Sequence, residues 1–372
     1  MEATSVPAPE GGRALTGSTE LARNALGLPQ VLFCIVTGSA PIAAMMFNDP
    51  LGGLGFGIAV PAGFWLATLA FLFFSIGYVE MAKRVTTAGG MYSYMSYGFG
   101  RVIGMGTAVG IAAAYMLFAV GVNGVTSYFA QVDIKDLTGG HVHPDWRIYA
   151  FIFIALMFLV SYFHVESVAK LLGFALIGEL LVLMAFSFGV LVHGGGPDGL
   201  VWQALNPASI FSGGDGVAGA TRVFGASAAG VGFFACFWSW VGFEMAPNYA
   251  EEARNPKRMM SAAIYISCIG LGVLYTFWSW MLISAYGASK DQWVWGVATQ
   301  YGYQGDNPAL APGSGLPGTS GEYGSVFFPV AHQFAGVGIR NLFEALIITG
   351  SFACSLAFWN TANRYLFAMG RE

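Results

Sequence analysis

Acidic residues inside apolar runs are the side chains of this sequence best able to do chemistry. Glu179 lies about 11 residues into the apolar run 168–192, at a depth of roughly 16 Å for a helix that rises about 1.5 Å per residue. An ionised carboxylate among Gly, Leu, Ile and Val is costly, so we expect Glu179 to hold a proton much of the time. Glu179 is therefore a candidate proton carrier. The alternative is a permanently neutral acid bonded to a neighbouring helix.

Three further residues are candidates for ion coupling. Glu244 lies in a run of aromatic residues between Gly242 and Pro247, and is a second proton site or a sensor of a cationic substrate group. Ser351 and Ser355 lie one turn apart on one face of a predicted helix and have hydroxyls that can bind sodium. Such a pair more often packs two helices together, which is the interpretation we favour.

The first apolar run is interrupted near its middle by Gly38, Ser39 and Pro41. Pro41 has no N–H, so the Thr37 carbonyl one turn earlier is expected to lose its helical partner. Polar backbone groups freed at this depth must line a polar cavity or pair with another helix, because lipid cannot satisfy them. An ordinary proline kink is the alternative for this run considered alone.

A second apolar run is interrupted in the same way, by Gly242, Glu244 and Pro247. Trp238 and Trp240 flank this interruption. They could face lipid as part of an aromatic belt, but such a belt lies at the membrane interface, so we favour a cavity.

The composition requires a membrane. Of the 372 residues 56% are hydrophobic and only 10% are charged, against roughly 25% in soluble domains. No stretch is basic enough for nucleic acid, and the four cysteines lack metal spacing. At about 20 residues per span we predict eight membrane helices, at 29–48, 54–79, 100–123, 147–163, 168–192, 222–249, 259–286 and 341–368.

Basic residues set the predicted orientation. Most of the sixteen Lys and Arg residues fall on the side that holds the N-terminus; the exceptions are Lys135, Arg147, Arg222, Lys290 and Arg340. Since basic loops stay in the cytoplasm, both termini are predicted to be cytoplasmic, with residues 1–28 as an N-terminal tail. The segment 287–340 is then an extracellular loop, either a cover over an outer entrance or a plain connector. Residues 326–334 within it are too few to span.

The two interrupted spans are the first and the sixth. Transporters built as inverted repeats of five helices break the first helix of each repeat and bind substrate at the midplane between the half-helices. We therefore predict an all-α integral membrane protein with an inverted-repeat, five-plus-five transporter fold, in which about eight helices are present and helices 1 and 6 are broken.

The chain resembles the amino acid-polyamine-organocation superfamily of permeases along nearly its whole length. The matching stretches are Asn24–Pro29, Ser39–Ala43, Thr87–Tyr94, Gly242–Glu244, Ala250–Arg258 and Asn363–Glu372. The resemblance implies ten core helices, usually followed by two more, so the chain looks like a truncated product or a fragment. We accordingly predict a permease domain at 29–372, with a first repeat at 29–192 and an incomplete second repeat at 222–372.

The resemblance also implies where substrate binds. In the family, amides at the break of helix 1 hold the substrate carboxylate, and carbonyls at the break of helix 6 hold its amine. The corresponding candidate substrate-binding residues are Val36, Gly38, Ser39, Ala40, Trp238, Ser239, Trp240 and Val241. Many relatives have a glycine where this chain has Ala40 before Pro41. This departure weakens the case for an α-carboxylate and leaves an amine or polyamine open.

Together these patterns predict a secondary-active transporter that moves an amino acid or related amine across the cytoplasmic membrane by alternating access. It is expected to be proton-coupled and to need no cofactor or metal, with the lipid bilayer and a small-molecule substrate as partners. The alternatives are sodium coupling, polyamine transport by the same fold, or a channel-like or inactive fragment. An enzyme is not expected, because all five histidines fall at or beyond span ends and catalytic motifs are absent.

Overall fold

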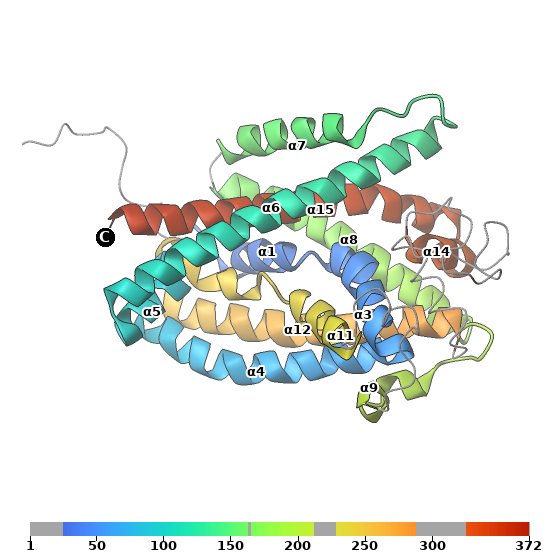
Figure 1. Cartoon of the computed structure of the whole chain (residues 1–372), viewed down its shortest axis with the longest axis horizontal. Helices are drawn as coiled ribbons and strands as arrows, with labels where there is room; N and C mark the ends of the chain where they lie inside the picture. Colours follow the sequence, from blue (N-terminus) through green and yellow to red (C-terminus); the bar gives the residue numbers. More distant parts are fainter. Residues whose placement is uncertain (1–24, 163–164, 212–227, 288–324, 372) are drawn as a thin grey trace, which may run out of the picture.

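Nearly every described residue of the computed structural model belongs to a helix, and no β-strand forms within the described ranges 25–162, 165–211, 228–287 and 325–371 (Figure 1). The α-helices and the shorter π- and 3₁₀-helices (η) are α1 (Leu28–Ser39), α2 (Pro41–Ala43), η1 (Ala44–Asn48), α3 (Asp49–Phe56), η2 (Gly57–Ala59), α4 (Val60–Arg84), α5 (Met91–Phe99), α6 (Arg101–Leu137), α7 (Trp146–Ser161), α8 (Val165–Val192), η3 (Trp202–Leu205), α9 (Ala208–Phe211), α11 (Ala228–Trp238), η4 (Phe243–Glu252), α12 (Pro256–Tyr286), α14 (Phe327–Ala335) and α15 (Val337–Arg371).

Among the described residues, six helical stretches are long and apolar enough to cross a membrane, namely Leu28–Arg84, Arg101–Lys135, Gly173–Val192, Ala229–Glu252, Pro256–Tyr286 and Val337–Arg371. The count differs from the predicted eight for two reasons. The first two predicted spans are counted within one stretch, because η1, α3 and η2 leave no loop between α1 and α4, although the helix is broken at Gly57, with a φ of 59° and a ψ of −126°. The fourth predicted span is α7, an apolar helix of 16 residues. These stretches make the protein a multi-pass, all-helical membrane protein.

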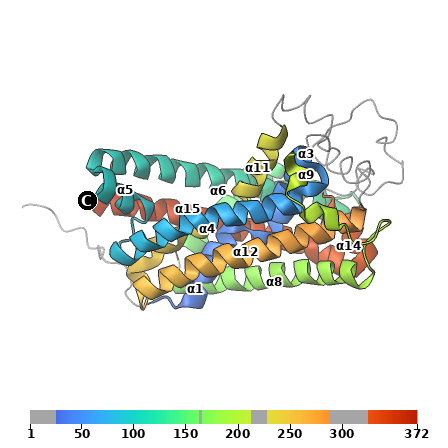
Figure 2. The same cartoon turned by 90° about the horizontal axis from the view of Figure 1, so that it is seen from below.

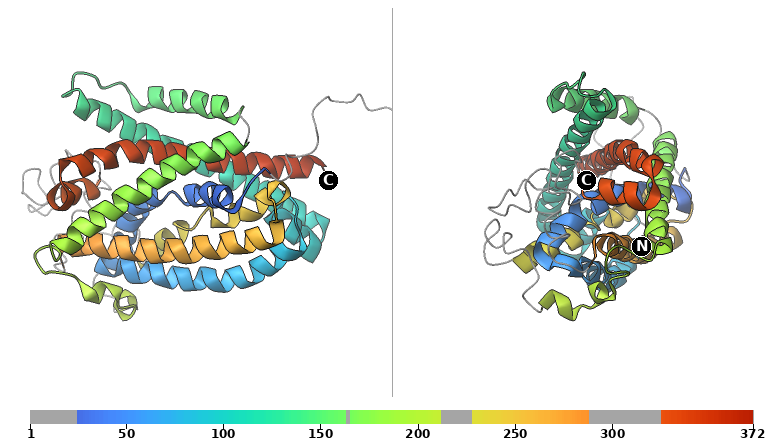
Figure 3. Two further views of the ribbon diagram at one scale, coloured as in Figure 1. Left: turned by 180° about the vertical axis from the view of Figure 1, so that it is seen from behind. Right: turned by 90° about the vertical axis from the view of Figure 1, so that its right-hand side faces the viewer.

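The long helices form a bundle along the longest axis of the molecule, with the broken helix α1–α3 inside it (Figures 1 and 2). Helix α1 packs against α8, α15, α12 and η4, while α4 pairs with α12 and α6 with α15. Helix α7, green in Figure 3, lies at the edge of the bundle beside α6. In Figure 1, α5 and the C-terminal end of α15 lie at one end, here called the α5 end, and α3, α9 and α14 lie at the opposite α14 end.

Several predicted boundaries differ from the structure. The break in the first span is at Ala40, as expected, but the span continues to Phe56 rather than 48. Helix α12 begins at Pro256, and the preceding Asn255 occupies the N-cap position without making a side-chain capping bond. The run near 326 is the nine-residue helix α14. Residues 1–24 of the predicted tail 1–28, most of the loop 287–340 and the predicted start of the sixth span at 222 lie outside the described residues.

Candidate functional site

The breaks in the two interrupted helices cross each other in the middle of the bundle. Helix α1 ends at Ser39, and Ala40 turns the chain with a φ of 43°. In the second interrupted helix, between α11 and η4, Gly242 has a φ of 118°. A Cβ added to Gly242 would lie 2.7 Å from the carbonyl carbon of Gly38 and 2.7 Å from the nitrogen of Ser39. Position 242 therefore requires glycine, both for its backbone angle and for this close approach.

Backbone groups freed at the first break are satisfied by nearby donors. The Thr37 carbonyl, which was expected to lose its partner to Pro41, instead accepts the N–H of Ala40 at 3.0 Å. Tyr275 of α12 donates its hydroxyl to the Ser39 carbonyl at 3.1 Å, and the Cys354 thiol of α15 donates to the Gly38 carbonyl at 3.2 Å. The break is thus a built turn held from two neighbouring helices, and is more than a proline kink.

A cavity of about 370 Å³ lies beside the crossing, which is enough room for a small organic molecule. Five of the eight predicted substrate-binding residues line it, namely Gly38, Ser39, Ala40, Trp238 and Val241. The lining is mainly apolar, and its polar side chains are Ser39, Asn48 and Cys354. Because its walls include Ser39 to Leu51, the cavity extends from the break along the half-helix that leads to the α14 end.

Three predicted substrate residues lie elsewhere. Val36 is half-buried in α1, outside the cavity wall. The buried hydroxyl of Ser239 accepts the Asn48 side-chain N–H at 3.0 Å and donates to the Ala235 carbonyl at 3.1 Å. Trp240 is fully buried in an aromatic cluster with Phe64, Phe71 and Tyr275. Ser239 therefore meets the cavity wall through Asn48, while Val36 and Trp240 are not among its lining residues.

Sequence reasoning missed the wall contributed by α6 and α15, which comprises Leu117, Phe118, Gly121, Val122, Val125, Cys354 and Phe358. No charge, proline or polar cluster marks these positions, so the sequence held no signal for them. Asn48 was also missed. It is an amide in an otherwise apolar run, and that feature could have identified it.

Glu179 of α8 reaches the start of the second half-helix. Its Oε2 accepts the backbone N–H of Ile42 at 3.1 Å, and its Oε1 is buried with no hydrogen-bond partner among the described residues. The carboxyl also lies against Gly350 of α15, where an added Cβ would be 2.5 Å from Oε1. An exposed N–H at the start of a helix favours an acceptor of negative charge. Glu179 thus lies behind the break, in contact with the element that follows it.

Glu244 is held in a separate polar group. One carboxylate oxygen accepts the hydroxyl of Tyr115 from α6, and the other accepts the Gly242 N–H at 2.8 Å. Tyr78 of α4 donates its hydroxyl to the Glu244 backbone carbonyl at 2.6 Å. This carboxylate therefore links the second break to α6, next to a smaller cavity of about 160 Å³.

The two serine candidates have different surroundings. The Ser355 hydroxyl donates to the Ala119 carbonyl of α6 at 2.7 Å and contacts the Met157 sulfur at 3.2 Å. The buried Ser351 hydroxyl has no partner among the described residues. Ser355 therefore joins α15 to α6, the packing role that the sequence analysis favoured.

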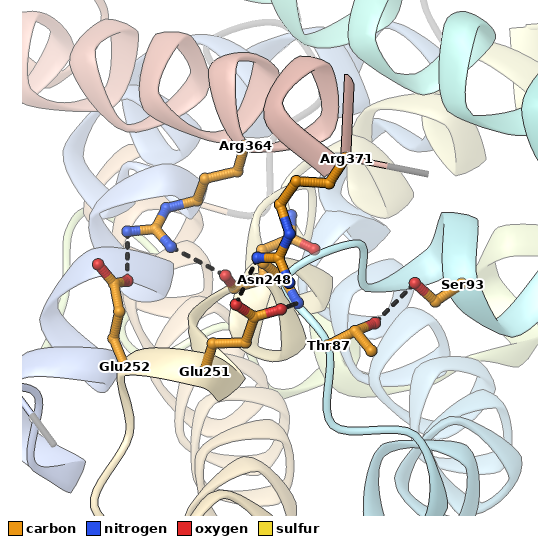
Figure 4. Close-up of polar contacts among 8 residues, drawn as sticks. Thr87, Ser93, Asn248, Glu251, Glu252, Arg364 and Arg371 are labelled. Atoms are coloured by element: carbon orange, nitrogen blue, oxygen red, sulfur yellow. Dashed lines mark hydrogen bonds and ion pairs between the residues drawn. The ribbon is translucent and has the colours of Figure 1, made fainter. Parts of the chain in front are cut away.

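A cluster of ion pairs closes the α5 end of the bundle (Figure 4). Arg364 of α15 pairs with Glu252 at 2.5 Å and donates to the Asn248 carbonyl at 2.9 Å, while Arg371 pairs with Glu251 at 2.8 Å. The sequence analysis did not identify either arginine as a partner of these acids. Residues on α15 and on η4 were too far apart in sequence to be matched.

This architecture of a helical bundle, with two crossing helix breaks beside a cavity of molecular size, is that of a membrane permease. The chain belongs to the amino acid permease family, which it matches over residues 26–372. The predicted resemblance to the amino acid-polyamine-organocation superfamily is confirmed. The family is one of transporters, as predicted, and not of enzymes.

The curated relatives are named as transporters of putrescine or of amino acids. The chain is 25% identical over 279 residues to the low-affinity putrescine importer PlaP of Escherichia coli (strain K12), covering 72% of this chain and 55% of that protein. It is 24% identical over 241 residues to the branched-chain amino acid permease BcaP of Bacillus subtilis (strain 168), covering 60% and 47%. Cationic amino acid transporter 4 of Homo sapiens is 24% identical over 278 residues, covering 69% and 41%. The chain thus spans about half the length of these relatives.

Proposed function

We propose that the protein is a secondary-active permease that moves an amino acid or related amine across the cytoplasmic membrane by alternating access. The observation that carries this proposal is the crossing of the two helix breaks, Gly38–Ser39 against Gly242, beside the 370 Å³ cavity. Backbone kept irregular at membrane depth is costly unless it serves a binding site. The cavity extends toward the α14 end while ion pairs close the α5 end, as expected for one state of an alternating-access cycle.

Coupling to protons is the second part of the proposal. Glu179 contacts both the start of the second half-helix, through Ile42, and α15, through Gly350. A change in its proton therefore alters a contact of the broken helix directly. Sodium coupling is the alternative, because the Ser355 hydroxyl donates its proton to the Ala119 carbonyl and keeps its oxygen lone pairs for a cation. Glu244, bonded to Tyr115, is a second proton site in this proposal.

The substrate is proposed to be neutral and largely apolar, or an amine without a carboxylate. Leu51, Phe118, Val122 and Phe358 are among the residues that line the cavity. The amides that a substrate carboxylate would need are used within the protein, since the Ala40 N–H bonds Thr37 and the Ile42 N–H bonds Glu179. The names of the relatives, which include a putrescine importer and a branched-chain amino acid permease, agree with this range.

The orientation follows from the basic residues. In this proposal the α5 end, with Arg364 and Arg371, faces the cytoplasm, and the α14 end faces outward.

The segments 29–192 and 222–372 belong to two inverted repeats. The crossing of α1–α3 with α11–η4 supports this arrangement, because each repeat would contribute one broken helix.

Uptake into proteoliposomes tests the proposal. Labelled amino acids and amines are offered with an imposed proton gradient, a sodium gradient or neither, and Glu179→Gln is compared with the unaltered protein. We expect saturable uptake driven by an inward proton gradient and lost in Glu179→Gln. Uptake that needs sodium and is unchanged in Glu179→Gln would refute proton coupling through Glu179. A flux that never saturates would refute the proposal that the protein is a carrier.

A further inference from the structure

Asp49 is a buried carboxylate that neither the sequence analysis nor the proposed mechanism uses. It is the first residue of α3, and its side chain is 0% exposed. Oδ1 accepts the hydroxyl of Ser279, on α12, at 2.8 Å. Oδ2 is buried with no hydrogen-bond partner in the described structure. The Ser279 hydroxyl is therefore the one hydrogen-bond partner that this carboxyl side chain has among the described residues.

The elements packed around Asp49 place no described cationic side chain in an ion pair with it. Helix α11 contributes the titratable thiol of Cys236, which is close enough to interact electrostatically with the carboxylate. Helix α12 contributes Ser279, and α4 meets α3 through contacts of Val60 with Gly52. No described Lys, Arg or His pairs with Asp49. An ionised, unpaired carboxylate in such a place costs several kcal/mol, whereas a neutral carboxyl does not.

The backbone next to Asp49 is also unusual. The five preceding residues, Ala44–Asn48, form a π-helical turn, which is rare and found mostly at functional sites. Asn48 lines the substrate cavity, while Asp49 faces away from it, toward α11 and α12. Ile42, which carries the contact to Glu179, is seven residues earlier, about 10 Å along a helix. The second half-helix, Pro41–Phe56, thus meets one buried carboxylate at its start and carries another near its middle.

We propose that Asp49 is a proton-binding site, separate from Glu179, that holds its proton while α3 is packed against α11 and α12 and releases it when α3 moves away. The neutral carboxyl suits the closed packing, and water that enters between α3 and α12 allows ionisation. Ser279 is the hydrogen-bond partner that positions the group. The release step rests on the proposed transport cycle, but the binding of the proton in this structure does not.

Infrared spectroscopy of the full protein in lipid bilayers tests the inference without needing transport. The carbonyl stretch of protonated carboxyl groups is compared at neutral pH for the unaltered protein, Asp49→Asn, Glu179→Gln and the double variant. Asn has nearly the shape of a neutral Asp, so Asp49→Asn is expected to fold. We expect it to remove band intensity equal to one carboxyl group, additively with Glu179→Gln. Ser279→Ala is expected to shift that component without removing it.

An unchanged band in Asp49→Asn, with the protein still monodisperse by size exclusion, would overturn the inference, because Asp49 would then be ionised when buried. A Ser279→Ala spectrum identical to that of the unaltered protein would overturn the assigned hydrogen bond. Failure of the proposed function is distinguishable from both results. In that case the unaltered protein takes up no amino acid or amine, while the band at Asp49 is still lost in Asp49→Asn.

Discussion

Ala40 turns the chain at the first break with a positive φ, the conformation that glycine adopts most readily. An L-residue held there stores about 1–3 kcal/mol of strain. The strain persists because its neighbours bond across the turn, with Tyr275 on the Ser39 carbonyl and Cys354 on the Gly38 carbonyl. The side chains of Tyr275 and Cys354 thus stabilise the backbone turn at the first break by hydrogen bonds to its carbonyls.

Replacing Ala40 with Gly is expected to stabilise the protein by about 1 kcal/mol, because relief of strain exceeds the entropy cost of glycine. The matched control is Ala43→Gly, three residues later. Ala43 has ordinary helical angles of −67° and −39°, so glycine there is expected to destabilise by about 0.5–1 kcal/mol. Melting temperatures in detergent compare the two. A lower melting temperature in Ala40→Gly would mean that the turn is not strained.

Gly350 makes room for Glu179. A Cβ at this position would meet Glu179 Oε1 at 2.5 Å, so Gly350→Ala is expected to displace the carboxyl from the Ile42 N–H and to reduce proton-driven uptake at least tenfold. Gly338→Ala, on the same helix with nothing within 4 Å, is the control and is expected to keep full uptake. Equal uptake by the two variants would show that the position of Glu179 does not matter.

At the scale of elements, the half-helices are fixed by close packing between the two interrupted spans. Phe56 of α3 lies between Gly63 of α4 and Gly232 of α11, where added Cβ atoms would be 2.7 Å and 2.6 Å from its ring. The backbones of the two breaks touch at Gly242. Glycine thus decides how closely the elements around the cavity approach one another.

Gly242→Ala is expected to abolish uptake and to lower the melting temperature, because the new methyl group would meet backbone atoms of Gly38 and Ser39 at a φ of 118°. Gly270→Ala, on the surface of α12 with open space around it, should be neutral or slightly stabilising. Wild-type uptake by Gly242→Ala would contradict the crossing of the two breaks.

The elements were more predictable from sequence than the site. Apolar runs and the prolines at 41 and 247 identified the spans and both breaks, since these features act within one helix. Contacts between helices were not predictable. The α6 wall at Gly121 and the pairing of Arg364 with Glu252 join segments that are more than 70 residues from their partners in the sequence, and no local pattern encodes them. The boundary between the first two spans was placed too early, because helical turns continue to Phe56 where a loop was expected.

At the scale of the whole molecule, the two ends of the bundle differ. The α5 end is closed by Glu252–Arg364 and Glu251–Arg371, and Arg364 also lies over the ring of Tyr249 at 4.2 Å (Figure 4). The first pair is nearly buried, with side chains 11% and 4% exposed, whereas the Arg371 side chain is 41% exposed. Burial therefore predicts that the two pairs contribute unequally to closure.

Arg364→Gln is expected to cost about 3–5 kcal/mol, because it leaves Glu252 buried without its partner. The exposed counterpart, Arg371→Gln, should cost about 0–1 kcal/mol.

Cys34, which is buried near Arg364 and Tyr249, reports opening in variants that keep it as the sole cysteine. We expect faster alkylation of Cys34 by a water-soluble maleimide in Arg364→Gln alone. Equal rates in both variants would refute unequal closure.

The central claim is that substrate binds in the cavity where the two helix breaks cross. Gly121 lines this cavity with nothing within 4 Å of its added Cβ, so Gly121→Phe is expected to place its ring in the cavity without a clash at its first side-chain atom. Gly110→Phe, on the same helix and also in open space, is the matched control. The most direct test measures saturable uptake of a neutral amino acid or amine by both variants in proteoliposomes. The account predicts that Gly121→Phe loses uptake and Gly110→Phe keeps it; full uptake by Gly121→Phe would contradict it.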